Sequence, residues 1–363
     1  MLIYILTELF VFICLDNYKK YDKQDFSCRK NHIKYFYKYL AIIILTLVFG
    51  LRSYSVGTDT KNYLQIFNWL GTNLDWNVMV YEKGFCILSI ITNKIFRNFT
   101  ALLLISGFII YWNIITAFCE LSELPAVSML CFFGIGSFAQ SCNLLRQYLA
   151  LSFCLIGLYY LIKKNNNFIF IIYIFIAFLF HKSAVVFIIF LPIKYMQFSI
   201  KYLILFCSGT ILIILFLPYI LKLFDLITGS SYYGYINIKS NTFTFYNFSI
   251  ILFSFLTLML LLKFKSIVND KFEKEYVFYI YMFTIFFCLI LISIFSVELV
   301  DRIAIYFLPS IFFLVPIILE SIKSYKSKFL IEMMFIVFFI LIFYTLVIRG
   351  SYEFLPYKFI QVL

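Results

Sequence analysis

Long apolar runs separated by short polar segments recur from one end of this sequence to the other. A run of about 20 apolar residues can cross a bilayer as an α-helix, and these runs lack the two-residue alternation of strands. We therefore expect an all-α polytopic membrane protein with about twelve transmembrane helices, within a range of ten to thirteen. The expected spans are 2–15, 36–51, 99–119, 124–140, 146–162, 167–180, 183–196, 202–222, 247–262, 276–295, 303–320 and 329–348.

Three apolar runs depart from the length of an ordinary span. The run at 82–96 is short and amphipathic, so we expect it to lie along the outer membrane interface rather than to cross the bilayer. The runs at 167–180 and 183–196 fall short of a full bilayer at about 1.5 Å per residue. We expect these two to be half-helices that meet at His181.

Composition and charge placement support the membrane class. Apolar residues make up 64% of the 363 residues and charged residues only 13%, so we expect a single integral-membrane domain over residues 1–363. The formal charge of +12 does not indicate nucleic acid, because 18 of the 30 Lys and Arg residues fall in the expected inside loops. Lys19 and Lys20 follow the first run, which favours an N-terminus outside.

The sequence gives no sign of a metal site or a cofactor. The nine cysteines are scattered, without a CxxC pair or a Cys/His spacing typical of zinc, and we interpret them as apolar packing residues. Neither GxxxxGK[ST] nor GxGxxG is present, so ATP is not indicated as a source of energy.

Ionisable residues at the ends of the apolar runs are the candidates for chemistry. In the expected threading six of them can be placed on the outer side, and charge near lipid is usually kept for function. Three arginines, two carboxylates and an imidazole on one side indicate an anionic, lipid-borne substrate. These residues are Arg52, Asp59, Glu82, Arg146, His181 and Arg302.

Each candidate also has a purely structural interpretation. Asp59 could cap the helix that follows it, and Glu82 could sit in the first turn of a helix. Arg52 could be an anchor at the end of a span, and Arg302 could pair with Glu298 four residues earlier. A lone histidine such as His181 is more often structural than catalytic.

The segment CNLLRQYLA at 142–150 is more specific. Asn143, Arg146 and Gln147 have the spacing i, i+3, i+4, which predicts one polar stripe on an otherwise apolar helix. A surface anchor needs a single charge, so this stripe favours a buried polar function. Asp59 and Tyr63 have the same i, i+4 relation and would share a helix face.

Taken together, the motifs GLRSYSVGTDTKNY, YEKGF, NLLRQYLA and FHKSA, followed by DRIAIY, resemble those of the EpsG family, which belongs with the Wzy-type polysaccharide polymerases. The resemblance spans residues 45–310. It implies a GT-C-like integral-membrane glycosyltransferase in the bacterial cytoplasmic (inner) membrane. Such an enzyme extends O-antigen, capsule or exopolysaccharide chains on the outer face, from repeat units carried on undecaprenyl diphosphate.

This resemblance, with the residue chemistry, predicts roles for the candidates. Guanidinium groups at the headgroup level match a diphosphate, and a base should deprotonate the acceptor hydroxyl. The catalytic candidates are Asp59, Glu82, His181 and Arg146. The substrate-binding candidates are Arg52, Tyr63, Asn143, Arg146, Gln147 and Arg302, and Tyr54, Tyr63, Trp69 and Trp76 could stack on sugars. The diphosphate supplies the energy, so no cofactor is expected, and a chain-length regulator protein is an expected partner beside the bilayer and the lipid-linked glycan.

Other functions fit the same features. An O-antigen ligase would use the same donor and similar arginines, but usually carries a larger outside loop between its late spans than 223–246. A flippase or transporter for lipid-linked glycans would need charge along a path through the bilayer rather than at one level. A membrane acyltransferase with a cytoplasmic thioester donor would need His181 inside.

Overall fold

The computed structural model describes residues 1–22, 28–72, 81–228, 245–268, 270–295, 298–348 and 353–360. Its regular structure is helical throughout these ranges, apart from one isolated antiparallel bridge between Arg52 and Phe359. The expected all-α class is therefore confirmed. The chain divides into two compact units, residues 1–188 with 326–363 and residues 189–325, and each is described by itself.

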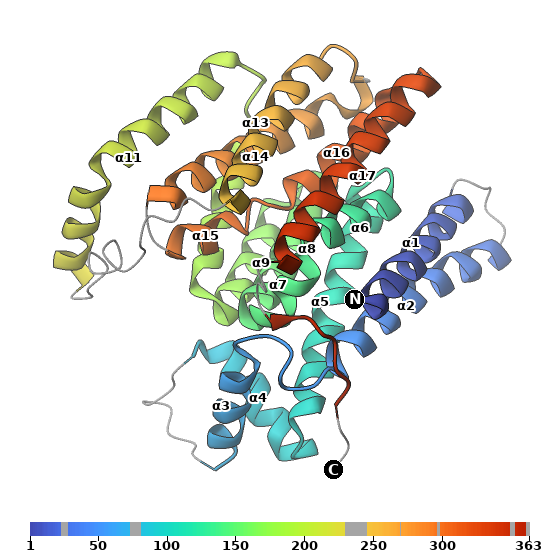
Figure 1. The fold of residues 1–363 in the computed structure, drawn as a ribbon, viewed down its shortest axis with the longest axis vertical. Coiled ribbons are helices and arrows are strands. Elements are labelled where there is room, and N and C mark those ends of the chain that lie inside the picture. The colour runs from blue at the N-terminus through green and yellow to red at the C-terminus, as the bar shows by residue number, and fades with distance from the viewer. Residues whose placement is uncertain are drawn as a thin grey trace. The chain divides into compact units, whose positions relative to one another are not determined.

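The first unit holds the N-terminal helices and the last helix (Figure 1). Within this unit α1 packs on α2, α2 on α5, α5 on α8 and α8 on α9. Its helices are α1 (Leu2–Asp22), α2 (Cys28–Gly50), α3 (Thr60–Thr72), α4 (Lys83–Phe96), α5 (Phe99–Leu121), α6 (Pro125–Gly134), α7 (Ser137–Asn143), α8 (Leu145–Ile162), α9 (Asn167–Phe180), the 3₁₀-helix η2 (Lys182–Ile189), which ends at the boundary, and α17 (Tyr325–Ile348).

The second unit is built around α14, which contacts α10, α11, α13, α15 and α16. Its helices are α10 (Phe190–Ile193), α11 (Ile200–Thr228), α13 (Phe245–Phe264), the 3₁₀-helix η3 (Asp270–Phe272), α14 (Glu273–Phe295), α15 (Glu298–Ala304) and α16 (Ser310–Ser321). Aromatic side chains fill the interior, as where Tyr279 stacks on Phe313 with ring centroids 5.0 Å apart.

Five helical segments in the described part of the chain are long and apolar enough to cross a membrane. They are Asn31–Gly50, Phe99–Leu121, Leu145–Ile162, Asp270–Ser293 and Tyr325–Tyr344. A sixth is possible if α6 and α7, which are bent by 62° at their junction, form one broken span. The expected count of twelve is therefore not confirmed, since several of the apolar runs form short or broken helices.

The structure also bears on the predictions for the short run at 82–96 and for the break at His181. The run at 82–96 forms the separate helix α4, as its amphipathic pattern predicted. Helix α9 ends at Phe180, His181 occupies its C-cap with extended backbone, and η2 follows at Lys182, so the predicted break at His181 is confirmed.

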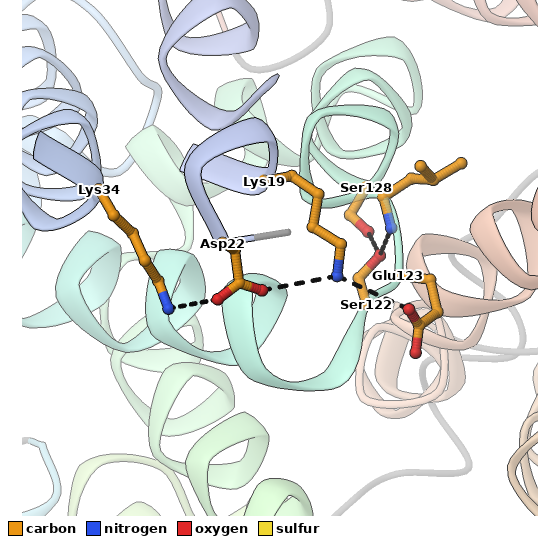
Figure 2. A network of polar contacts seen from close by, with 7 residues as sticks. Lys19, Asp22, Lys34, Ser122, Glu123 and Ser128 are labelled. Carbon is orange, nitrogen blue, oxygen red and sulfur yellow. Dashed lines mark hydrogen bonds and ion pairs between the residues drawn. The ribbon is translucent and has the colours of Figure 1, made fainter. Parts of the chain in front are cut away.

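A polar network joins the loops at one end of the first unit (Figure 2). Lys19 in α1 lies 3.9 Å from Asp22 and 3.6 Å from Glu123, which follows α5, and Lys34 in α2 pairs with the same Asp22. Ser128 donates to Ser122 at 2.7 Å, which closes the turn between α5 and α6. Lys19, Asp22 and Lys34 thus meet Glu123, and all four belong to segments expected inside.

Candidate functional site

Glu82 joins two cationic or basic side chains that lie far away in the sequence. Its Oε2 accepts a hydrogen bond from Arg146 Nη1, which forms an ion pair. Its Oε1 lies 3.0 Å from His181 Nδ1 and accepts a hydrogen bond from the Lys182 backbone N–H at 3.3 Å. Residues separated by 64 and 99 positions thus meet at one carboxylate.

Local backbone geometry brings Glu82 to His181. Glu82 is the N-cap residue of α4, with φ −60° and ψ 143°, so its side chain leaves the start of the helix. A Cβ at Gly84 would lie 2.7 Å from the Leu179 carbonyl oxygen, so only glycine lets the first turn of α4 approach the end of α9 this closely. The close approach of α4 to α9 therefore explains the glycine in the YEKGF motif.

Arg146 lies in the first turn of α8 and is surrounded by aromatic rings. Its guanidinium carbon lies 3.7 Å from the centroid of the Tyr81 ring, a cation–π distance. The guanidinium also hydrogen-bonds the Tyr63 hydroxyl. The side chains of Arg146, Glu82 and His181 are 18%, 11% and 16% exposed, so the cluster is mostly buried but can be reached from outside.

The environment fixes the protonation of two members. Burial opposes ionisation of Glu82, but the hydrogen bond from His181 and the charge of Arg146 lower the pKa of Glu82 to about 2. Burial raises the pKa of Tyr63 to about 12. At neutral pH Glu82 is therefore a carboxylate and Tyr63 a neutral phenol.

Asp59 lies beside this cluster in the loop that leads into α3. The Oδ1 atom of Asn143 accepts hydrogen bonds from Thr58 Oγ1 at 2.7 Å and from the Asp59 backbone N–H at 2.8 Å. Gly57 has φ +93°, and a Cβ there would lie 3.0 Å from the Cys142 carbonyl oxygen. The Asp59 charge raises the pKa of Tyr81, after the larger effect of burial, which places that carboxylate near the rings around Arg146.

The predicted stripe of Asn143, Arg146 and Gln147 on one helix is wrong. Helix α7 ends at Asn143, and Leu144, with φ −90° and ψ 53°, separates it from α8, which begins at Leu145. The i, i+3, i+4 relation requires continuous helix, and this backbone interrupts it. Asn143 instead fixes the loop at 58–59, while Arg146 faces Glu82.

Arg52 lies in a different environment from Arg146. Its side chain is fully buried, and its guanidinium donates through Nη1 to the Phe49 carbonyl and through Nη2 to the Cys142 carbonyl at 2.9 Å. Its guanidinium carbon also lies 4.0 Å from the centroid of the Phe49 ring. The predicted contact of Arg52 with a diphosphate stays a prediction.

The other candidates are placed as follows. Tyr63 is only 4% exposed, so its ring offers no free face for sugar stacking, and Gln147 is buried at 3% exposed. Arg302 is exposed in α15 and belongs to the second unit. Trp76 lies outside the described residues, while Tyr54 donates to or accepts from Thr100 at 3.0 Å and Trp69 packs between α3 and α4.

Sequence reasoning missed two members of the cluster. The Tyr81 ring makes a cation–π contact with the Arg146 guanidinium, and the Lys182 backbone N–H donates a hydrogen bond to Glu82. Both residues are immediate neighbours of predicted residues, so the motifs YEKGF and FHKSA already contained them. No group of three or more metal-ligating side chains occurs among the residues that the structure describes.

Apolar helices of bilayer length, together with this partly exposed cluster of charge, define a helical membrane protein with a polar site at the helix ends. The model of the EpsG family matches residues 35–359, and the chain belongs to this family, one of exopolysaccharide and O-antigen polymerase-like proteins. No curated protein and no solved structure matches the chain. The family match covers every residue of the cluster.

Proposed function

We propose that this protein is a polysaccharide polymerase that joins oligosaccharide repeat units carried on undecaprenyl diphosphate. Membership of the EpsG family supports a polymerase-type membrane protein. The observation that carries the proposal is the single carboxylate of Glu82 held between the Arg146 guanidinium and the His181 imidazole. The reaction needs one group of each kind, a cation for a departing diphosphate and a base for an incoming hydroxyl.

Arg146 is the group that we assign to the diphosphate. A guanidinium presents a planar fork of donors that matches phosphate oxygens, and it remains charged at all relevant pH values. It lies in the first turn of α8, where the helix dipole also favours an anion. In the reaction, the bond between the anomeric carbon and the diphosphate oxygen breaks, and Arg146 stabilises the negative charge that develops on that oxygen.

His181 is the group that we assign to the acceptor. In the tautomer whose Nδ1–H donates a hydrogen bond to Glu82, the neutral imidazole carries a lone pair on Nε2. This nitrogen can take the proton of an acceptor sugar hydroxyl as the hydroxyl oxygen attacks the anomeric carbon. Glu82, with a pKa of about 2, is too weak a base for this step at neutral pH. In this assignment Glu82 is a positioning residue that orients both His181 and Arg146.

The remaining candidates take supporting roles in this proposal. Asp59 lies near the cluster and is assigned to holding the acceptor sugar, while Asn143 fixes the loop that carries it. Tyr63 hydrogen-bonds the Arg146 guanidinium, and Gln147, the next residue of α8, is buried. Arg302, which lies in the second unit, stays a candidate for binding the substrate.

The test of this function is reconstitution with a defined substrate. Purified protein in lipid vesicles, supplied with an undecaprenyl-diphosphate-linked repeat unit, is expected to release undecaprenyl diphosphate and to build a ladder of chains on gels. A product with a single transfer to a lipid-A-type core would instead indicate a ligase. Movement of intact lipid-linked glycan between leaflets without bond formation would indicate a flippase, and either result would overturn the polymerase assignment.

We place the site on the outer face of the bacterial cytoplasmic membrane, with the N-terminus on the same side. The Tyr4 hydroxyl donates to the Phe354 carbonyl at 2.9 Å, and residues 353–360 lie against the loop at 51–57, so both ends of the chain accompany the site. The basic residues of the opposite loops favour the cytoplasm for that end.

Cysteine labelling tests this orientation. In a cysteine-free background, Ser55→Cys and Lys358→Cys, both exposed at the site end, are expected to react with an impermeant thiol reagent in intact cells. Lys163→Cys and Lys271→Cys, in loops expected inside, should react only after permeabilisation. The reverse pattern would place the site in the cytoplasm and favour the acyltransferase interpretation.

A further inference from the structure

The C-terminal residues 353–360, called the C-terminal strap below, lie along the loop that leads to Asp59. The strap and the loop run antiparallel, with Phe359 opposite Arg52 as a non-hydrogen-bonded pair. The backbone hydrogen bonds run from Ser53 N to Lys358 O (2.7 Å), from Ile360 N to Leu51 O (2.9 Å) and from Gly57 N to Glu353 O (3.4 Å). Figure 1 shows this segment, in dark red, passing close to the start of the blue loop.

Two side chains anchor the strap. Phe354 is 2% exposed and packs edge-on against Tyr4, with ring centroids 5.6 Å apart. The Tyr357 hydroxyl donates at 2.8 Å to the carbonyl of Val48, one of the last four carbonyls of α2, which have no partner within the helix. The strap therefore caps α2 from outside the helix.

Arg52, which lies under the strap, caps two helices at once. Its guanidinium donates to the Phe49 carbonyl in the last turn of α2 and to the Cys142 carbonyl in the last turn of α7. Both helix C-termini carry partial negative charge, which a buried cation stabilises. With no exposed surface, Arg52 is placed to join the two helices rather than to meet a substrate.

The contacts continue from Arg52 to the site. The loop binds the end of α7 at two neighbouring residues. Arg52 donates to the Cys142 carbonyl, while Thr58 and the Asp59 backbone donate to the Asn143 side chain. Arg146 follows three residues later, at the start of α8. A shift of the loop would therefore move Asp59 directly, and would move Arg146 through the junction between α7 and α8.

We propose that the C-terminal strap and Arg52 are positioning elements of the site, which hold the loop at 51–59 and the end of α7 in register. The inference rests on the proposed function for its kinetic consequence, but its structural consequence can be measured without any activity. In this proposal the buried hydrogen bonds of Arg52 and the backbone hydrogen bonds of the strap set the positions of Asp59 and Arg146, although they lie away from Glu82.

Hydrogen exchange of purified protein in nanodiscs measures the structural consequence. A variant that ends at Tyr352 is expected to exchange amides in peptides covering 50–60 and 140–147 at least tenfold faster than the full chain. Addition of a peptide with the sequence of residues 353–363 should restore protection. Peptides from α9 should be unchanged, since among the described residues α9 makes no backbone hydrogen bond to the strap.

Point substitutions keep the test decisive if the shortened chain fails to fold. Tyr357→Phe removes one hydrogen bond and should speed exchange at 50–60 by about five- to tenfold. Arg52→Lys keeps the charge but cannot reach both carbonyls, so it should loosen 140–147. The matched control is Lys358→Ala, whose exposed side chain leaves the backbone contacts intact and should change nothing.

Kinetics complete the test. If loop placement limits catalysis, the shortened variant and Arg52→Lys should lose kcat by about 10²-fold with KM within about twofold, per folded molecule. A raised KM with unchanged kcat for Arg52→Lys would assign Arg52 to substrate binding and overturn the positioning role. Unchanged exchange in the shortened chain would overturn the strap itself, whereas a wild-type chain that makes no polymer would refute only the proposed function.

Discussion

Arg146→Ala is expected to abolish polymer and leave only single repeat units, while the protein still reaches the membrane in near-normal amount. The substitution removes the one partly exposed guanidinium that the cluster offers to a diphosphate. Loss of one such transition-state contact typically lowers the rate by about 10²–10³. Arg146→Lys should fail almost as badly, because an ammonium does not reproduce the fork of donors or its stacking on Tyr81. Chain-length profiles on gels, read beside membrane protein levels, check this.

A control for Arg146→Ala must account for Glu82, whose carboxylate loses its guanidinium partner in this variant. Without the guanidinium, Glu82 would remain largely buried without its ion-pair partner, which destabilises a protein more than loss of the pair as a whole. The double variant Arg146→Ala, Glu82→Gln removes that charge, so it should accumulate in the membrane at least as well as Arg146→Ala and still make no polymer. Lys94→Ala, an exposed cation in the last turn of α4, should behave as wild type. Normal polymer from Arg146→Ala would end the diphosphate assignment.

His181→Gln is expected to lower kcat by about 10²–10⁴, the usual contribution of a general base. Glutamine can still donate a hydrogen bond to Glu82, but it cannot take a proton at neutral pH. The fold should therefore persist while the chemistry fails. Initial rates with the reconstituted protein and a defined lipid-linked repeat unit measure the effect. Asp59→Asn is the matched comparison, since asparagine caps a helix about as well as aspartate and only the ability to take a proton is lost.

A double-mutant cycle separates His181 from Glu82 as the base. If Glu82 acts through His181, Glu82→Gln should cost little further rate in a His181→Gln background, because the two residues act as a unit. Additive losses would indicate that Glu82 also acts apart from His181, for example by orienting Arg146. A wild-type rate in His181→Gln together with a large loss in Asp59→Asn would make Asp59 the base.

The pH dependence adds a separate constraint. The pKa of Glu82 is lowered from 4.5 to about 2, so the ionised form stabilises the cluster above about pH 4.5. This contribution is lost as the pH falls toward about 2. Any change of kcat between about pH 5 and 8 therefore does not come from the titration of Glu82.

The helical class and the boundaries of many helices follow from the sequence, because apolar runs and their polar interruptions are local features. The start of α4 near Glu82 and the break at His181 were both predicted from the lengths of runs. The span count was not, since run length alone does not tell a crossing helix from a broken one such as α6 and α7. The backbone at Leu144, which ends α7, carries no proline or glycine to reveal it.

The sequence by itself determined that this is a helical membrane protein of the EpsG family, and that Glu82, Arg146 and His181 are candidates for chemistry. Only the tertiary structure decided that one carboxylate joins the other two, and that Arg52 caps two helices beneath the C-terminal strap. The physical reason is the short reach of the sequence pattern, because the periodicity of a helix tells only which residues within about four positions share a face. Partners 64, 90 and 99 residues apart meet only through the packing of whole helices.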